Sequence, residues 1–190
     1  MEDDIQLVER FKRGNESAFD ELVKRHYQRV CNILFHAVGA LPNVEDMAQE
    51  VFLKAYHGLQ QYRGDSTFST WIYRIAVNVG LDELRREKRK RLLRFTRLED
   101  LGARGHEVED VQPGARRPDS QLEQKELADT LQRAMKHLPK KHRLVFSLRE
   151  IEEFSYSEIA EIMGCSTGTV KSRLFYARAK LQRYLKSYLR

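Results

Sequence analysis

A chain of 190 residues can form one domain or two small ones, and its hydrophobic share of 41% suffices for packed cores. A net charge of +6 and an isoelectric point near 9.3 favour a polyanionic partner. No apolar run approaches the roughly 18 residues of a membrane span and the acidic start lacks a signal segment, so we expect a soluble cytoplasmic protein without membrane insertion.

The first part of the chain has helical periodicity, and nothing in it suggests strands. A short helix over residues 5–13 is predicted to end at Gly14. A long amphipathic helix follows until Gly39 and Pro42 break it, and Asn43 then caps a third helix. These patterns predict an all-α fold.

The third helix carries a first candidate functional surface. Its apolar stripe leaves four residues largely outside the predicted core: Asp46, Gln49, Glu50 and Leu53. A leucine beside polar side chains is typical of a protein-docking face. An exposed leucine is also common on ordinary surfaces, so spacing alone leaves both interpretations open.

A loop at residues 63–66 precedes the fourth helix, which we expect Ser66 to cap. This helix is apolar on more than one side and is expected to lie at the centre of its domain. An aromatic ring, an amide and arginines share one of its faces: Trp71, Arg74, Asn78 and Arg85. Such a face suits single-stranded DNA, because rings stack on unpaired bases and arginines hold the backbone. The alternative is a core tryptophan beside a solvated arginine stripe.

Composition divides the chain into two parts. The fourth helix ends in the basic block RREKRKRLLR, residues 85–94, which suits a phosphate backbone. The following stretch is rich in Glu, Asp, Gly, Pro and Arg, as in a flexible linker. We therefore predict two small helical domains, residues 1–94 and 122–190, joined by a linker at 95–121. In the second domain, Pro139 stops one helix and starts the next.

The stretch from residue 155 to 181 reads as two helices joined by a tight turn. Ser155 and Glu158 have the form of a capping box, Gly164 stands where a helix ends in a left-handed conformation, and Ser166 can cap the second helix. This pattern is typical of a helix-turn-helix whose second helix enters the major groove. The alternative is a helical hairpin with a solvated charged face.

The outward face of that second helix favours the DNA-binding interpretation. It carries Ser172, Phe175 and Tyr176, flanked by Lys171, Arg173 and Arg178, and residues 164–190 contain no acid. No P-loop, dinucleotide fingerprint, nucleophile elbow or zinc spacing is present. Cys31 and Cys165 are expected to be buried thiols. We therefore expect no catalytic residue, no metal site and no cofactor, and a protein that is not an enzyme.

Four motifs follow one another along nearly the whole chain: DMAQEVFLKAY (46–56), YRGDSTFSTWIYRIAVN (62–78), LPKKHRLVFSLREIEEFSYSEIA (138–160) and GTVKSRLFYARAKL (168–181). In this order, divided by a linker, they resemble the extracytoplasmic-function (group 4) sigma factors of bacterial RNA polymerase, in the sigma-70 family. The resemblance implies a region 2 domain, a region 4 domain, and an alternative sigma factor that directs promoter-specific transcription initiation.

The resemblance also implies roles for residues. Core RNA polymerase would bind Asp46, Gln49, Glu50 and Leu53. The loop at 63–69 would hold an extruded base of the −10 element, and melting would involve Arg63, Asp65, Phe68, Trp71, Arg74, Asn78 and Arg85. Promoter DNA at the −35 element would be read by Thr167, Thr169, Lys171, Ser172, Arg173, Phe175, Tyr176 and Arg178. The family often has a basic residue where this chain has Tyr176, so we expect one backbone or base contact to be replaced by stacking or lost.

Further implications concern partners. An anti-sigma factor commonly holds members of this family inactive, so we expect such a partner, and we expect no obligate homo-oligomer. Two other classes of protein compete with this interpretation. An autonomous helix-turn-helix transcriptional regulator would need a sensor or dimerising domain, and the first 94 residues show no α/β pattern for one. A helical adaptor without DNA binding does not account for the basic stripes.

Overall fold

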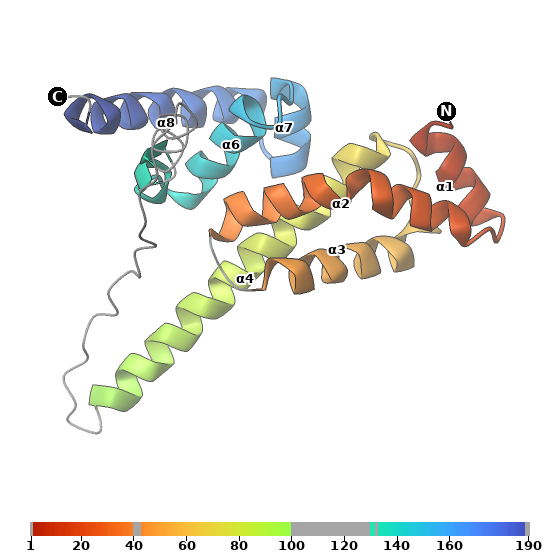
Figure 1. The fold of residues 1–190 in the computed structure, drawn as a ribbon, viewed down its shortest axis with the longest axis horizontal. Helices are drawn as coiled ribbons and strands as arrows, with labels where there is room; N and C mark the ends of the chain where they lie inside the picture. The colour runs from red at the N-terminus through yellow and green to blue at the C-terminus, as the bar shows by residue number, and fades with distance from the viewer. Residues whose placement is uncertain (1, 40–42, 100–129, 132, 189–190) are drawn as a thin grey trace, which may run out of the picture.

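The described part of the computed structural model comprises residues 2–39, 43–99, 130–131 and 133–188, and it consists of helices joined by turns and loops (Figure 1). None of these residues lies in a strand, which confirms the predicted all-α fold. The elements are α1 (Asp4–Lys12), α2 (Ser17–Val38), α3 (Val44–Leu59), α4 (Phe68–Glu99), α6 (Lys140–Glu150), α7 (Tyr156–Met163) and α8 (Thr167–Tyr188).

The N-terminal helices form a bundle in which α2, α3 and α4 pack against one another and α1 packs on α2. Gly80 allows a close approach of α4 to α2, because a Cβ added there would lie only 2.8 Å from the Cβ of Ala37. Apolar burial stabilises the bundle by about 25 cal/mol per Å² removed from water. Its largest fully buried side chains are Leu7, Leu22, Ile33, Leu34, Leu59, Phe68, Ile72 and Tyr73.

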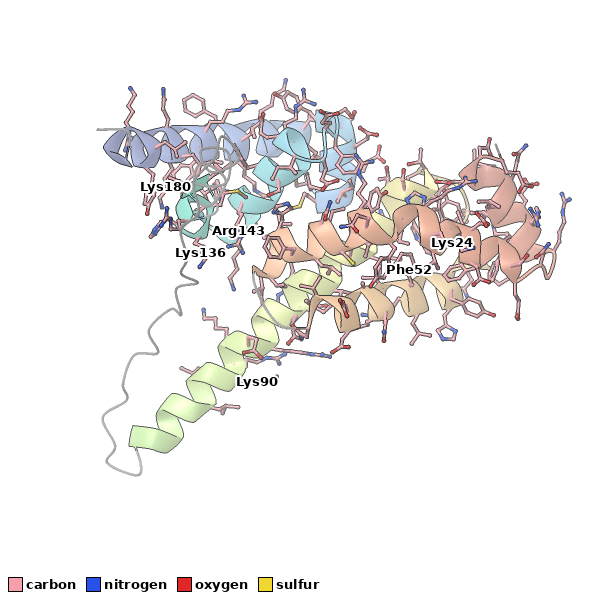
Figure 2. All side chains as sticks on the ribbon, in the orientation of Figure 1. Lys24, Phe52, Lys90, Lys136, Arg143 and Lys180 are labelled. Atoms are coloured by element: carbon pink, nitrogen blue, oxygen red, sulfur yellow. The ribbon has the colours of Figure 1, made fainter. Side chains whose placement is uncertain are left out.

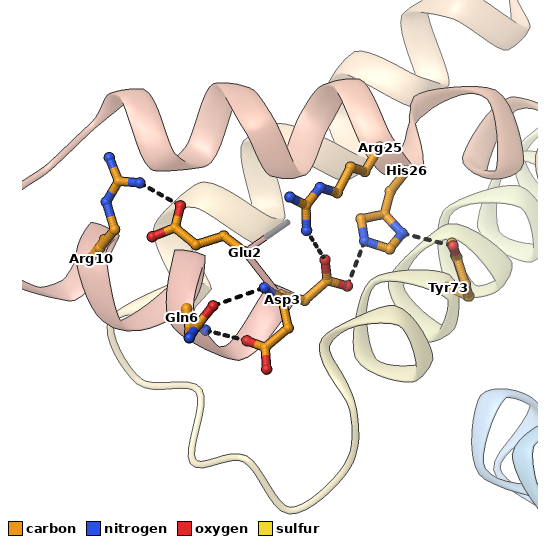
Figure 3. Close-up of polar contacts among 8 residues, drawn as sticks. Glu2, Asp3, Gln6, Arg10, Arg25, His26 and Tyr73 are labelled. Atoms are coloured by element: carbon orange, nitrogen blue, oxygen red, sulfur yellow. Dashed lines mark hydrogen bonds and ion pairs between the residues drawn. The ribbon is translucent and has the colours of Figure 1, made fainter.

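A buried polar network fastens α1 to the bundle (Figure 3). His26 Nε2 lies 2.8 Å from Asp4 Oδ2, and its Nδ1 lies 2.7 Å from the Tyr73 hydroxyl. Burial outweighs the attraction of Asp4 and lowers the pKa of His26, while burial raises the pKa of Tyr73 to about 12. A neutral His26 therefore donates to Asp4 through Nε2–H and accepts the Tyr73 hydroxyl proton at Nδ1.

The C-terminal helices α6, α7 and α8 form a second packed group. Their capping signals are confirmed. Ser155 and Glu158 form a capping box at the start of α7, and Gly164 ends this helix at φ 58°, ψ 47°. The Thr169 amide donates to Ser166 Oγ, which caps α8. These bonds satisfy amides that a helix start leaves unpaired. Residues close in sequence therefore determine where α7 ends and α8 begins.

Two helix boundaries differ from the prediction. Thr67, not Ser66, caps α4, since the Thr70 amide donates to Thr67 Oγ1 at 3.2 Å. The same helix continues to Glu99, past the predicted domain end at residue 94. Residues 91–99 contain neither glycine nor proline, so no local signal ends the helix there. The remainder of the predicted linker and the predicted domain start at 122 lie outside the described residues.

The N-terminal bundle and the C-terminal group are in direct contact. The first helix of the helix-turn-helix, α7, packs on α4, and α6 packs on α2. Leu144, Leu148 and Ile159 of the C-terminal group belong to one core cluster with the buried residues of the bundle. The apolar core is therefore continuous across both halves.

Candidate nucleic-acid interface

The helix-turn-helix presents one face of α8 to solvent. The buried stripe of Val170, Leu174 and Ala177 holds this helix against the rest of the group. The Ser155 side chain and amide donate to the carboxylate of Glu158, and these hydrogen bonds lower its pKa below the ordinary value. The capping box therefore fixes the start of α7, and α7 packs against α8.

Six of the eight residues predicted to read the −35 element are exposed: Thr167, Lys171, Ser172, Phe175, Tyr176 and Arg178. Phe175 is the most prominent, with 76% of its surface exposed. The other two are half-buried and have partners within the protein. Thr169 Oγ1 lies 2.9 Å from Ser166 Oγ, and Arg173 donates to Cys165 Sγ. An apolar ring surrounded by cationic and hydroxyl groups suits thymine methyl and phosphate contacts.

Two members of this face are restrained by α6. The Arg178 guanidinium donates twice to Glu150 Oε1, at 2.6 and 3.2 Å. The Tyr176 ring packs on His142, with ring centroids 4.8 Å apart. Both side chains of the ion pair are largely exposed, and pairs of this kind contribute about 0–1 kcal/mol. Arg178 can therefore exchange Glu150 for a phosphate at small cost.

A second polar stripe lies on α4. Arg74, Asn78 and Arg85 are exposed along one face, as predicted from their spacing. Arg85 is ion-paired with Asp82 on the same helix. The stripe leads into the basic length of α4 around Lys90, which projects beyond the other helices (Figure 2). Acidic residues pair with some of these cations along the helix, and the net positive charge of this length of α4 suits a nucleic-acid backbone.

Trp71 begins the stripe and is half-buried in an aromatic group. Its ring lies 5.1 Å from that of Tyr62 and 5.8 Å from that of Phe68, by centroids. Gly58 on α3 makes room for it, since a Cβ there would lie 3.2 Å from the indole. The surrounding rings fix the orientation of the indole while part of it remains accessible.

The structure places Phe68 differently from its predicted role as a DNA contact. It is only 2% exposed and packs edge-on against His26, with centroids 5.2 Å apart. A ring buried on this scale touches no base without rearrangement, so Phe68 supports Trp71 from behind. Arg63 and Asp65, on the preceding loop, are exposed.

Sequence reasoning missed Tyr62. This residue packs on Trp71, donates its hydroxyl proton to the Ser66 carbonyl and accepts Lys12 at its own carbonyl. It thereby anchors both ends of the loop at residues 63–66. The available signal was an aromatic residue directly before a turn sequence that a tryptophan follows.

The predicted docking face of α3 is open to solvent. Asp46, Gln49 and Leu53 are exposed, and 58% of the leucine surface is accessible. Glu50 is half-buried and pairs with Lys54 at 2.7 Å, one turn later. An accessible leucine between acidic and amide groups is the composition expected of a polar-rimmed anchor.

Among the described residues, no cluster of three or more His, Cys, Asp or Glu side chains is arranged to hold a metal ion. Nor does any described helix combine the length and apolarity of a membrane span.

Comparison with known proteins identifies both halves. Residues 22–90 match Sigma-70 region 2, and residues 128–181 match Sigma-70, region 4. The RNA polymerase sigma-H factor of Pseudomonas aeruginosa is 36% identical over 192 residues, covering 100% of this chain and 97% of that protein. The ECF RNA polymerase sigma-E factor of Escherichia coli K12 is 35% identical over 187 residues, covering 98% of this chain and 96% of that protein.

A solved structure of CnrH in complex with the cytosolic domain of CnrY is similar in fold. It has a TM-score of 0.66 and 28% sequence identity, and the match covers 97% of each chain. The sequence and fold agree over the full length. The chain therefore belongs to the extracytoplasmic-function sigma factors of the sigma-70 family, and it is a transcription initiation factor, not an enzyme.

Proposed function

We propose that this sigma factor brings core RNA polymerase to promoters through three surfaces of distinct chemistry. The observation that carries the proposal is their separation on different helices. The leucine-centred face lies on α3, the tryptophan–amide–arginine stripe lies on α4, and the basic aromatic face lies on α8. Docking, strand opening and duplex reading can thus proceed on one chain without competing for side chains.

The −35 element would be read as a duplex by α8. Its N-terminal turns would enter the major groove, where Lys171 and Ser172 contact phosphates or base edges and Phe175 packs on a thymine methyl group. Arg178 would exchange Glu150 for the backbone. The side chain of Tyr176, held on His142, would occupy the position where the family often has a cation.

The −10 element would be read as a single strand by α4 and the loop before it. A flipped base would lie against the accessible part of Trp71, and stacking of this kind contributes about 1–3 kcal/mol per base. The amide of Asn78 would bond a base edge, and Arg74 and Arg85 would hold the backbone. Phe68 and Tyr62 would keep the indole in place.

The polymerase clamp would bind the α3 face formed by Asp46, Gln49, Glu50 and Leu53. Control by an anti-sigma factor belongs to the same proposal, because a solved structure of similar fold is that of the sigma factor RpoE of Bartonella quintana in complex with the anti-sigma factor NepR. We propose action in the cytoplasm as a monomer without membrane insertion, since the polymerase supplies the assembly. Domain limits at residues 1–94 and 122–190, with a linker at 95–121, remain our proposal.

Binding to core polymerase tests the docking face. The paired substitutions Gln49→Ala and Leu53→Ala should weaken core binding by tenfold or more, as expected for a central anchor. The matched control, Ile5→Ala with Gln28→Ala, removes an exposed apolar and an exposed amide side chain elsewhere on the N-terminal half. Equal core affinity of the two pairs would refute the docking face.

A second experiment, on promoter binding, distinguishes the sigma factor from an autonomous regulator. An autonomous helix-turn-helix regulator would bind its duplex tightly and specifically without polymerase. A sigma factor with two modest DNA contacts should gain promoter affinity only when the polymerase fixes their spacing, because linked contacts add through effective concentration. Electrophoretic mobility of a promoter fragment with and without core polymerase measures this difference.

A further inference from the structure

The two halves meet at a charged contact that no promoter-reading role explains. Glu152 lies in the loop between α6 and α7 and is only 6% exposed. Arg29 on α2 donates through Nε to Glu152 Oε2 at 2.8 Å, and through a terminal nitrogen to the Glu152 carbonyl at 2.7 Å. The second carboxylate oxygen, Oε1, is buried without a hydrogen-bond partner among the described residues. Arg29 therefore offsets part of the cost of burying this carboxylate.

Two aromatic rings make cation–π contacts with the same arginine. The Arg29 guanidinium lies 4.8 Å from the ring centre of Phe154 and 6.0 Å from that of Tyr73. The two rings meet edge to face, with centroids 5.5 Å apart. Phe154 comes from the loop and Tyr73 from α4, so a cation of the N-terminal half contacts one ring from each half.

A second arginine makes the reciprocal contact. Arg143 on α6 donates to the carbonyls of His36 and Ala37 at 3.0 and 2.8 Å. These carbonyls belong to the last turn of α2, where a helix leaves its acceptors unpaired and carries partial negative charge. Burial lowers the pKa of Arg143. Each half thus supplies one arginine to a matched acceptor on the other.

This contact is incompatible with simultaneous reading of both promoter elements. Elements centred at −10 and −35 lie about 25 base pairs apart, or about 85 Å along B-form DNA at about 3.4 Å per base pair. Here α7 packs on α4 and α8 packs on α7. Packed helix axes are about 8–10 Å apart, so the near part of α8 lies within about 20 Å of α4. The halves must separate before both elements can be contacted.

We infer that the N-terminal half carries a docking site for the chain's own loop Glu152–Phe154, and that this intramolecular latch keeps the free sigma factor closed. The inference rests on the proposed function, because closure matters only if both halves read DNA. The latch has limited strength for two reasons. Its ion pair reaches the surface through Arg29, whose side chain is 43% exposed, and one carboxylate oxygen has no hydrogen-bond partner in the described part of the chain. Binding of the two halves to the polymerase would then have to replace only the weak contact between Arg29 and the loop Glu152–Phe154.

Energy transfer between dyes on the full-length free chain tests the latch. The dyes are attached near the contact, at the exposed positions Gln28→Cys on α2 and Glu161→Cys on α7, with Cys31 and Cys165 replaced by alanine. The wild-type background should show high transfer. Arg29→Glu should shift the ratio of closed to open chains by about tenfold towards open and lower transfer accordingly. Glu152→Gln, which alters the other side of the same contact, should act in the same direction.

The control is Lys24→Glu, an equal charge reversal on α2 at an exposed residue that pairs with Glu21 of the same helix. It should leave transfer unchanged. Circular dichroism should show unchanged helix content in all three variants, because Arg29, Glu152 and Lys24 do not belong to the apolar core. Transfer in the wild type as low as in Arg29→Glu would overturn the latch. This readout needs no polymerase, so a failure of promoter opening would bear on the proposed function and not on the latch.

Discussion

Gly80→Ala perturbs the closest approach between α2 and α4, on which the N-terminal bundle depends. In an exposed helix interior this change is favourable by about 1 kcal/mol, because alanine loses less conformational freedom than glycine. At position 80 the added Cβ would lie 2.8 Å from the Cβ of Ala37. Carbon atoms in contact prefer about 3.5–4.0 Å, so the two effects oppose each other.

The steric effect should prevail. Both Cβ atoms are attached directly to helix backbones, so no side-chain rotation relieves the contact, and the helices must separate by about 1 Å. Overpacking of this kind costs about 1–3 kcal/mol. After the helix-propensity gain of about 1 kcal/mol, a net loss near 1 kcal/mol remains in the free energy of unfolding. For a chain of this size that lowers the melting temperature by about 2–4 °C.

Thermal unfolding followed by circular dichroism measures the effect. The matched control is Gly168→Ala in α8, where an added Cβ meets nothing closer than Ser166 Oγ at 3.8 Å. The control should melt at the wild-type temperature or slightly above it. A Gly80→Ala protein that melts above the wild type would refute the close approach of α2 and α4.

Three further predictions concern single contacts. Ser155→Ala removes the capping box of α7 and should lower the free energy of unfolding by about 1 kcal/mol, measured by urea unfolding, whereas Ser157→Ala at a neighbouring exposed position should not. Gly58→Ala should displace the Trp71 indole, which lies 3.2 Å from the added atom, and so shift tryptophan fluorescence and weaken −10 strand opening; unchanged fluorescence would contradict this. The pKa of His26 lies below its ordinary value of 6.5 because of burial, so the unfolded chain binds the proton more tightly. The stability that this neutral histidine contributes is complete above pH 6.5 and is lost as the pH falls below that value towards the folded pKa. Melting temperatures between pH 7.5 and 5.5 should therefore fall, and fall less in His26→Gln; equal slopes would refute the assignment.

The local signals of the helix-turn-helix were sufficient to predict its structure. The capping box, the left-handed Gly164 and the Ser166 cap depend on contacts within a few residues, so the sequence contains all the groups involved. The choice of Thr67 over Ser66 as the cap of α4 is harder to predict from the sequence. Two adjacent hydroxyls have the same capping chemistry, and the packing of the whole loop decides between them.

Features that depend on distant residues were not predictable in this way. Phe68 stands in a stretch rich in candidate DNA contacts, and only its packing on His26 shows that it is buried. The contact between Arg29 and Glu152 joins residues far apart in sequence. Each reads as an ordinary surface charge until the tertiary arrangement is known.

Strand opening tests the central claim most directly. A promoter fragment carrying a fluorescent base in its −10 element is mixed with core RNA polymerase, this chain, or both. A fluorescence rise should require both proteins and be lost in Asn78→Ala and Trp71→Ala. Arg13→Ala, at an exposed residue that pairs with Glu9 of α1, should behave as the wild type. Tight duplex binding by the chain alone, with no change on adding the polymerase, would contradict the account and favour an autonomous regulator.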